Sequence, residues 1–156
     1  MSEKKNLVVI GYGGMGGGFH CTHAQKSDVV SLAGIYDIDP EKRAKAEANG
    51  IKAYPTLEAV LEDRSVDLVT VAVPNDCHKD IVIRALEAGK NVICEKPLAL
   101  SYSDAKEMFD LAKAKNLMLC ACQSMRFTPD RLEAKAMIEA GALGDIYYGE
   151  FSRIRR

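Results

Sequence analysis

The sequence predicts an α/β fold in which helices cover both faces of a parallel sheet, a doubly wound arrangement. Between residues 6 and 140, short apolar runs alternate with longer segments that carry apolar residues at helical spacing. The run at residues 67–73 is almost continuously apolar, as expected for a strand that is buried on both faces. A glycine-rich turn directly follows the first run, at the point where a strand should pass into a helix.

The apolar runs place six strands along the chain. We expect them at residues 6–10, 29–36, 51–54, 67–73, 91–94 and 117–122. Helices are expected between these strands, and several begin with a capping signal. Asp39-Pro40 combines a capping side chain with a proline suited to the first helical position, and Thr128-Pro129 repeats this pattern. Ser101 marks the start of a further amphipathic helix.

The last segment differs from the rest. Residues 145–156 have a strand-like pattern in Ile146, Tyr148 and Phe151, but no later strand follows with which they could pair. A single unpaired strand exposes its backbone edge. We therefore expect residues 1–124 to form the sheet domain, and residues 125–156 to form a connecting helix and the first strand of a second, α+β domain that is truncated here.

Composition limits the classes of function. The chain has 156 residues, enough for one domain, and its net charge of -1 offers no basic surface for nucleic acid. The apolar runs are too short for a signal peptide or a membrane span. The five cysteines are odd in number and lie mostly in apolar runs, which indicates reduced thiols. These features predict a cytoplasmic protein.

The glycine-rich turn is the first motif that carries chemistry. It reads Gly11, Tyr12, Gly13, Gly14, Met15 and Gly16. In a dinucleotide-binding turn of this pattern, the first glycine permits the turn, the second lets the backbone approach the pyrophosphate, and the third lets helix and strand pack closely. The amide groups at the helix start then face the phosphate charge. A tight connection without a ligand is the alternative for such a turn taken alone.

Asp37 lies about 20 residues beyond this turn, at the end of the second predicted strand. A carboxylate there accepts hydrogen bonds from the adenosine ribose and repels the 2'-phosphate of NADP, so Asp37 favours NAD. Arg43 would weaken this preference if its helix directs it toward the ribose.

No metal site is predicted. His20 and His23 share a helix face, but no third ligand lies near them in the sequence. Cys120 and Cys122 lack the second pair that a zinc site requires, so core packing is their expected role.

Two further motifs follow strands. One reads Val71-Ala72-Val73-Pro74-Asn75-Asp76-Cys77-His78, and the other reads Val92-Ile93-Cys94-Glu95-Lys96-Pro97-Leu98. Together with the glycine turn, they resemble the glucose-fructose oxidoreductase and inositol dehydrogenase (Gfo/Idh/MocA) family. The resemblance implies a Rossmann fold and a dehydrogenase of sugars, polyols or related small hydroxy compounds. It also implies homo-oligomers formed through a carboxyl-terminal domain, which supplies an Asp and a His to the active site.

The resemblance assigns roles to individual residues. Lys96 is the expected catalytic residue, since a lysine partly desolvated by the nicotinamide can have a depressed pKa and exchange a proton with a substrate hydroxyl. Glu95 would orient Lys96 or contact the nicotinamide ribose, and Pro97 would follow a cis bond. The other expected cofactor neighbours are Val73, Pro74, Asn75 and His78. Gln123 and Arg126 would approach the nicotinamide or the substrate.

Two other functions fit parts of this pattern. A non-catalytic dinucleotide-binding or redox-sensing module shares the glycine turn and Asp37, but leaves Lys96 without a task. An unrelated biosynthetic reductase with the same nucleotide fold is a third reading, because a fold does not fix a function. On the leading hypothesis, we expect this chain to bind NAD but not to turn over substrate by itself.

Overall fold

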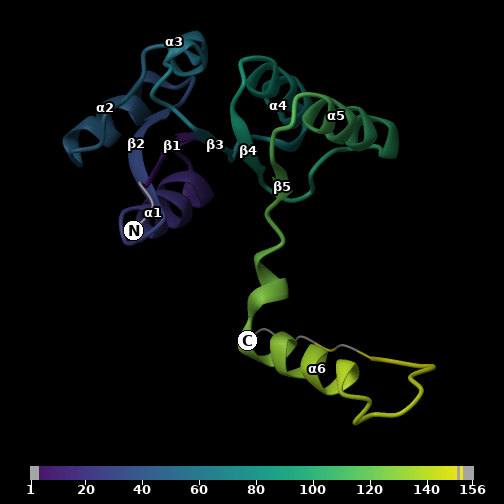
Figure 1. Ribbon diagram of the computed structural model, residues 1–156. Helices are drawn as coiled ribbons and strands as arrows, with labels where there is room; N and C mark the ends of the chain where they lie inside the picture. Colours follow the sequence, from purple (N-terminus) through teal and green to yellow (C-terminus); the bar gives the residue numbers. More distant parts are fainter. Residues whose placement is uncertain (1–3, 151, 153–156) are drawn as a thin grey trace. The chain divides into compact units, whose positions relative to one another are not determined.

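The computed structural model describes residues 4–150 and residue 152, and the chain divides into two compact units, Met1–Cys122 and Gln123–Arg156 (Figure 1). No helix in these described parts is long and apolar enough to cross a membrane.

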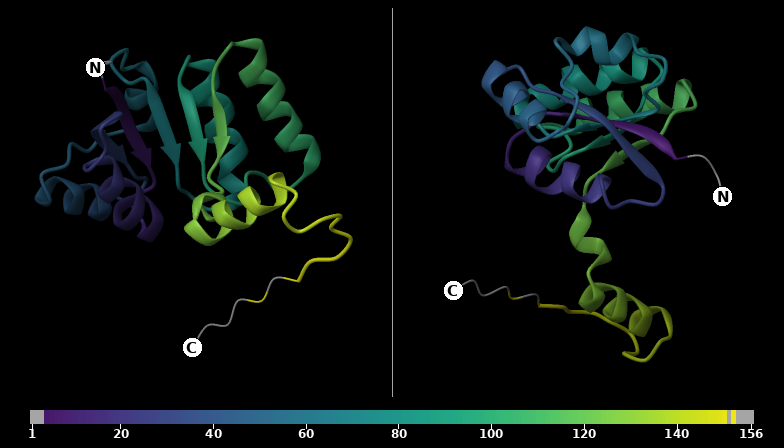
Figure 2. Two further views of the ribbon diagram at one scale, coloured as in Figure 1. Left: turned by 60° about the horizontal axis from the view of Figure 1, so that its bottom comes forward. Right: turned by 90° about the vertical axis from the view of Figure 1, so that its left-hand side faces the viewer.

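The first unit is built on a five-stranded sheet in the order β2-β1-β3-β4-β5, and its strands are drawn lengthwise, side by side, in the left view of Figure 2. The strands are β1 (Lys5–Ile10), β2 (Val30–Tyr36), β3 (Leu68–Val71), β4 (Asn91–Cys94) and β5 (Leu119–Ala121). Every neighbouring pair is parallel. The direction of strand succession reverses between β1 and β3, and the edge beside such a reversal is where ligands bind in open α/β sheets.

Helical segments connect the strands. They are η1 (Gly14–Cys21), α1 (Thr22–Ala24), α2 (Pro40–Ala48), α3 (Leu57–Glu62), η2 (Asn75–Cys77), α4 (His78–Glu87) and α5 (Tyr102–Ala114). Side chains of β1 alternate between two hydrophobic clusters, because successive residues of a strand point to opposite faces. Val8 and Ile10 pack with residues of α4 and α5, whereas Leu7 and Val9 pack with residues of α1 and α2. The doubly wound arrangement is thereby confirmed.

The strand expected at residues 51–54 was wrong. Only one parallel bridge forms there, between Ile35 and Ala53, at the edge of the sheet beyond β2. The backbone of Ile35 accounts for it, since its N–H donates to Lys52 O and its carbonyl accepts from Tyr54 N, both at 2.8 Å. The segment then turns toward α3 before a ladder can continue.

The helix caps were predicted with mixed success. The Asp39 side chain caps α2 by accepting from Glu41 N, and Ser101 caps α5 by accepting from Asp104 N. Thr128 precedes a helix, but its hydroxyl donates to Met125 O at 3.1 Å and does not cap it. Pro129 occupies the first turn of that helix as predicted, but the prediction that Thr128 caps it was wrong.

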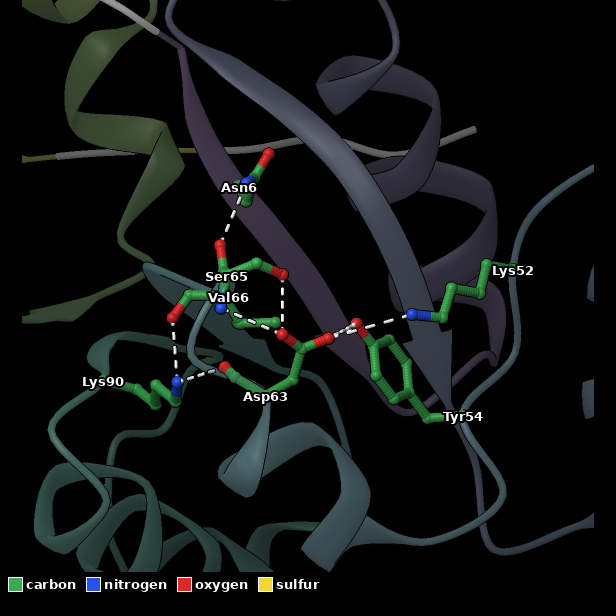
Figure 3. Close-up of polar contacts among 7 residues, drawn as sticks. All are labelled: Asn6, Lys52, Tyr54, Asp63, Ser65, Val66 and Lys90. Carbon is green, nitrogen blue, oxygen red and sulfur yellow. Dashed lines mark hydrogen bonds and ion pairs between the residues drawn. The ribbon is translucent and has the colours of Figure 1, made fainter.

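A polar network fixes the amino ends of β3 and β4 (Figure 3). The Asp63 carboxylate accepts from the Tyr54 hydroxyl at 2.8 Å and from Ser65 N at 2.9 Å. The Lys90 ammonium, just before β4, donates to the carbonyls of Asp63 and Val66. This network lies at the amino edge of the sheet, opposite to the carboxyl ends of the strands.

The second unit contains η3 (Ser124–Phe127) and α6 (Pro129–Glu139). The terminal strand expected at residues 145–156 is not found at residues 145–150 or 152, which form neither helix nor strand, and its other positions lie outside the described residues. A strand needs a hydrogen-bonded neighbour, and the described residues of this unit offer none.

Candidate functional site

Three loops meet at the carboxyl edge of the sheet, because parallel strands end on the same side. They follow β1, β3 and β4 and contain the glycine turn, the Val73–His78 segment and the Glu-Lys-Pro turn. The strand order β2-β1-β3-β4 determines which of these loops lie next to one another. Asp37 joins the same edge, directly after β2.

Backbone packing requires two of the three motif glycines. Gly11 has a φ of +95°, and a Cβ there would lie 2.3 Å from Ala72 O. A Cβ at Gly16 would lie 1.7 Å from Gly11 O. The turn and the close approach of helix to strand therefore exclude side chains at both positions.

Gly13 is different, since a Cβ on it would meet no protein atom within 4 Å. Because Gly13 has no side chain, the space beside the turn stays free, next to exposed Gly14 and Met15. No side chain caps the start of η1. An uncapped helix start beside open space is a suitable site for a phosphate group.

Asp37 is only 5% exposed and is part of the turn's own structure. Its Oδ2 accepts from Tyr12 N at 2.7 Å, and its Oδ1 accepts from Asp39 N at 2.9 Å. A carboxylate offers about four acceptor positions, so two remain for other donors such as ribose hydroxyls. The carboxylate thus links the glycine turn after β1 to the loop after β2.

Lys42 forms an ion pair with the Asp37 carboxylate, with Nζ 3.6 Å from Oδ2. Arg43, which the sequence singled out, donates from Nη1 to the carbonyls of Asp37 at 2.7 Å and Ile38 at 3.1 Å. Arg43 therefore stabilises the loop backbone. Sequence reasoning missed Lys42, although its place in the first turn of α2 was a usable signal.

His78 connects the loops after β3 and β4. It is 1% exposed, with Nδ1 2.9 Å from Pro97 O and Nε2 3.0 Å from Val73 O. Both contacts are hydrogen bonds only when both ring nitrogens carry a proton. These contacts connect the two loops through His78, which stays a predicted cofactor neighbour. Pro74 and Asn75 are exposed at this edge.

The Glu-Lys-Pro turn divides its side chains between the interior and solvent. Glu95 is 5% exposed, whereas Lys96 and Pro97 are exposed. The Lys96–Pro97 peptide bond is cis, as predicted. The Glu95 carboxylate contacts the Lys96 backbone, with Lys96 N donating to Oε2 at 3.1 Å. Lys96 is thus an exposed residue at the edge, on a turn whose backbone the Glu95 side chain holds.

Burial raises the pKa of Glu95, but hydrogen bonds from His20, from the Lys96 amide and from Cys122 outweigh it, so the pKa lies below its usual value. His20 Nε2 is 2.8 Å from Glu95 Oε1. His20 and Cys122 are the functional candidates that sequence reasoning misplaced, because their partner is far away in the chain. His23 lies three residues after His20 in the sequence, but its Nδ1 contacts Phe19 O at 2.8 Å.

Two weaker candidates belong to the second unit. Gln123 and Arg126 are exposed there, within or next to η3.

Comparison with known proteins agrees with this geometry. Residues 5–122 match the model of the oxidoreductase family with an NAD-binding Rossmann fold, GFO_IDH_MocA. An uncharacterized oxidoreductase of Streptococcus pneumoniae is 38% identical over 149 residues, covering 93% of this chain and 40% of its own length. Levoglucosan dehydrogenase of Pseudarthrobacter phenanthrenivorans is 42% identical over 88 residues, covering 56% and 23%.

Solved structures share the fold of this chain. An NAD-binding protein from Listeria innocua has a TM-score of 0.84 at 43% identity, covering 92% of this chain and 42% of its own. GenD2 from gentamicin A biosynthesis, solved in complex with NAD, has a TM-score of 0.84 at 29% identity, covering 91% and 41%. The chain spans less than half the length of these relatives. It belongs to the Gfo/Idh/MocA family of oxidoreductases with an NAD-binding Rossmann fold.

Proposed function

We propose that the protein is an NAD-dependent dehydrogenase of a sugar, a polyol or a related hydroxy compound, and that the described sheet unit is its cofactor-binding part. The observation that supports this most strongly is the meeting of the glycine turn, Asp37 and Lys96 at one sheet edge. The similarity to levoglucosan dehydrogenase supports the substrate class.

The residues present fit a dinucleotide. Gly13 leaves space at an uncapped helix start, which suits the pyrophosphate. Asp37 keeps acceptor positions for the adenosine ribose, and Pro74 and Asn75 line the exposed edge beyond β3. Tyr12, Gly14, Met15, Val73 and Pro97 complete the proposed cofactor site.

When bound, the nicotinamide ring supplies the hydride acceptor. Lys96 would take the proton of the substrate hydroxyl at its Nζ, and the fixed Glu95-Lys96-Pro97 turn would hold that nitrogen in place. Lys96 is exposed in this chain, so exclusion of water from the reaction is a task for other parts of the enzyme.

Cofactor preference is tested by titrating the chain with NADH and NADPH while following nucleotide fluorescence. We expect NADH to bind more tightly, and Asp37→Ser to reduce its affinity by about tenfold, since a hydrogen bond to a charged group is lost. Asp39→Ser is the matched control, because serine also caps α2. Tighter binding of NADPH by the unaltered chain would overturn the role given to Asp37.

Catalysis is tested by Lys96→Ala in the complete gene product, with levoglucosan and myo-inositol among the compounds offered with NAD. We expect turnover to fall by about 100-fold or more, as for loss of a general base. Lys113→Ala, an exposed change on α5, should leave turnover unaltered. If the Lys96 variant keeps its rate, Lys96 is not catalytic. If NADH binds but no compound is oxidised, a non-catalytic dinucleotide-binding module is the better description.

A further inference from the structure

Three side chains from distant parts of the first unit meet beside Lys96. His20 lies on η1, Glu95 follows β4, and Cys122 follows β5. One nitrogen, one oxygen and one sulfur atom of the three residues all lie within 4.8 Å of one another. Such a group could bind a metal ion or form a hydrogen-bonded cluster, and the two possibilities differ in geometry.

The distances favour hydrogen bonds. His20 Nε2 and Glu95 Oε1 are 2.8 Å apart, a normal hydrogen-bond length. Two ligands on tetrahedral zinc, each bound at about 2.0–2.1 Å, would be about 3.3 Å apart. The other Glu95 oxygen accepts from Lys96 N, and the Cys122 thiol also bonds to the carboxylate. The carboxylate is thus satisfied by protein donors.

The cluster holds a buried charge. Glu95 is 5% exposed, and the His20 side chain is 10% exposed. Because an ionised carboxylate can only accept, the imidazole donates from Nε2. Removing this donor would leave a buried carboxylate with fewer partners, which is more costly than losing the same bond at the surface.

The bond also joins two motifs. η1 begins directly after the glycine turn and has the wide π-helical form over Gly14–Cys21, a form frequent at functional sites. His20 lies near its end and reaches across 75 positions in sequence to Glu95. The two motifs proposed to hold the cofactor are therefore connected by one side-chain contact that no sequence spacing indicates.

We propose that His20 is a positioning residue for the dinucleotide site: it holds the Glu95 carboxylate, with help from Cys122, and so fixes the Glu95-Lys96-Pro97 turn relative to the glycine turn. This proposal rests on the dinucleotide-binding function proposed above. His20 acts through Glu95 and Lys96 and is not itself assigned a contact with substrate or cofactor.

The test compares His20→Ala and His20→Gln in this chain. NADH affinity is measured by fluorescence, and exchange of the Lys96 amide hydrogen is measured by NMR. We expect His20→Ala to weaken NADH binding by about tenfold and to speed exchange at Lys96 by a similar factor. Glutamine can donate from its side-chain amide, so His20→Gln should restore most of both.

Controls separate the outcomes. His23→Ala removes an exposed histidine of the same region, and Cys120→Ala is the counterpart of Cys122→Ala. Both controls should leave NADH binding unaltered, whereas Cys122→Ala should weaken it. Unchanged binding and exchange in His20→Ala would refute the proposal, and so would equal losses in His20→Ala and His20→Gln. One equivalent of zinc retained by the unaltered chain and lost in His20→Ala would replace it by a metal site.

The failure of the proposed function would look different. In that case the unaltered chain would not bind NADH at all, while exchange at Lys96 would still report whether His20 holds the turn. If His20→Ala does not fold, the glutamine variant and Cys122→Ala still decide the question.

Discussion

Gly16 and Gly13 belong to the same turn, but only Gly16 lacks room for a side chain. A side chain at Gly16 would overlap the backbone of Gly11, whereas one at Gly13 would point into open space. Gly16 is therefore required by the fold, whereas Gly13 is required only if a ligand approaches the turn. This difference allows the effects of stability and binding to be separated at single residues.

We predict that Gly16→Ala destabilises the fold by about 1–3 kcal/mol, as overpacking against backbone does. Gly13→Ala should leave the melting temperature nearly unchanged and weaken NADH binding, because a methyl group would occupy the space proposed for the pyrophosphate. Thermal melting and NADH titration of both variants check this. A Gly13 variant that binds NADH normally would argue against the pyrophosphate position.

At the scale of elements, the two ends of the short strands β3 and β4 have different roles. Their amino ends are fixed by the Asp63 network, and their carboxyl ends lead into the loops of the candidate site. The pKa of Asp63 is lowered from 3.8 to about 2, first by the hydrogen bond from the Ser65 side chain and then by those from Ser65 N and Tyr54. The ionised form is therefore the one that stabilises the folded state.

This shift predicts a pH dependence. A carboxyl group whose pKa is lowered by folding contributes stability that is complete above its unfolded pKa and is lost as the pH falls through its folded pKa. The melting temperature of the unaltered chain should thus fall more steeply than that of Asp63→Ala between about pH 5 and about pH 2. Asp28→Asn, an exposed change outside the network, should follow the unaltered chain. Parallel curves for the Asp63 variant and the unaltered chain would contradict the prediction.

At the scale of the whole molecule, the sheet order β2-β1-β3-β4-β5 explains why the site lies where it does. β1 is flanked by β2 on one side and by β3 on the other, so Asp37, the glycine turn and the loop after β3 are neighbours at one edge. The Glu-Lys-Pro turn follows the next strand. The family match covers residues 5–122, which is essentially this unit.

The sequence alone determined the fold class, because strands and helices are encoded by local patterns, namely apolar runs and helical spacing. It also located the glycine turn, Asp37 and Glu95-Lys96-Pro97, since each directly follows a predicted strand. Tertiary structure decided the contacts between distant residues: His20 with Glu95, His78 with the backbone of Pro97, and Asp37 with the amide of Tyr12. Those pairings depend on which strands become neighbours, and periodicity carries no information about that order.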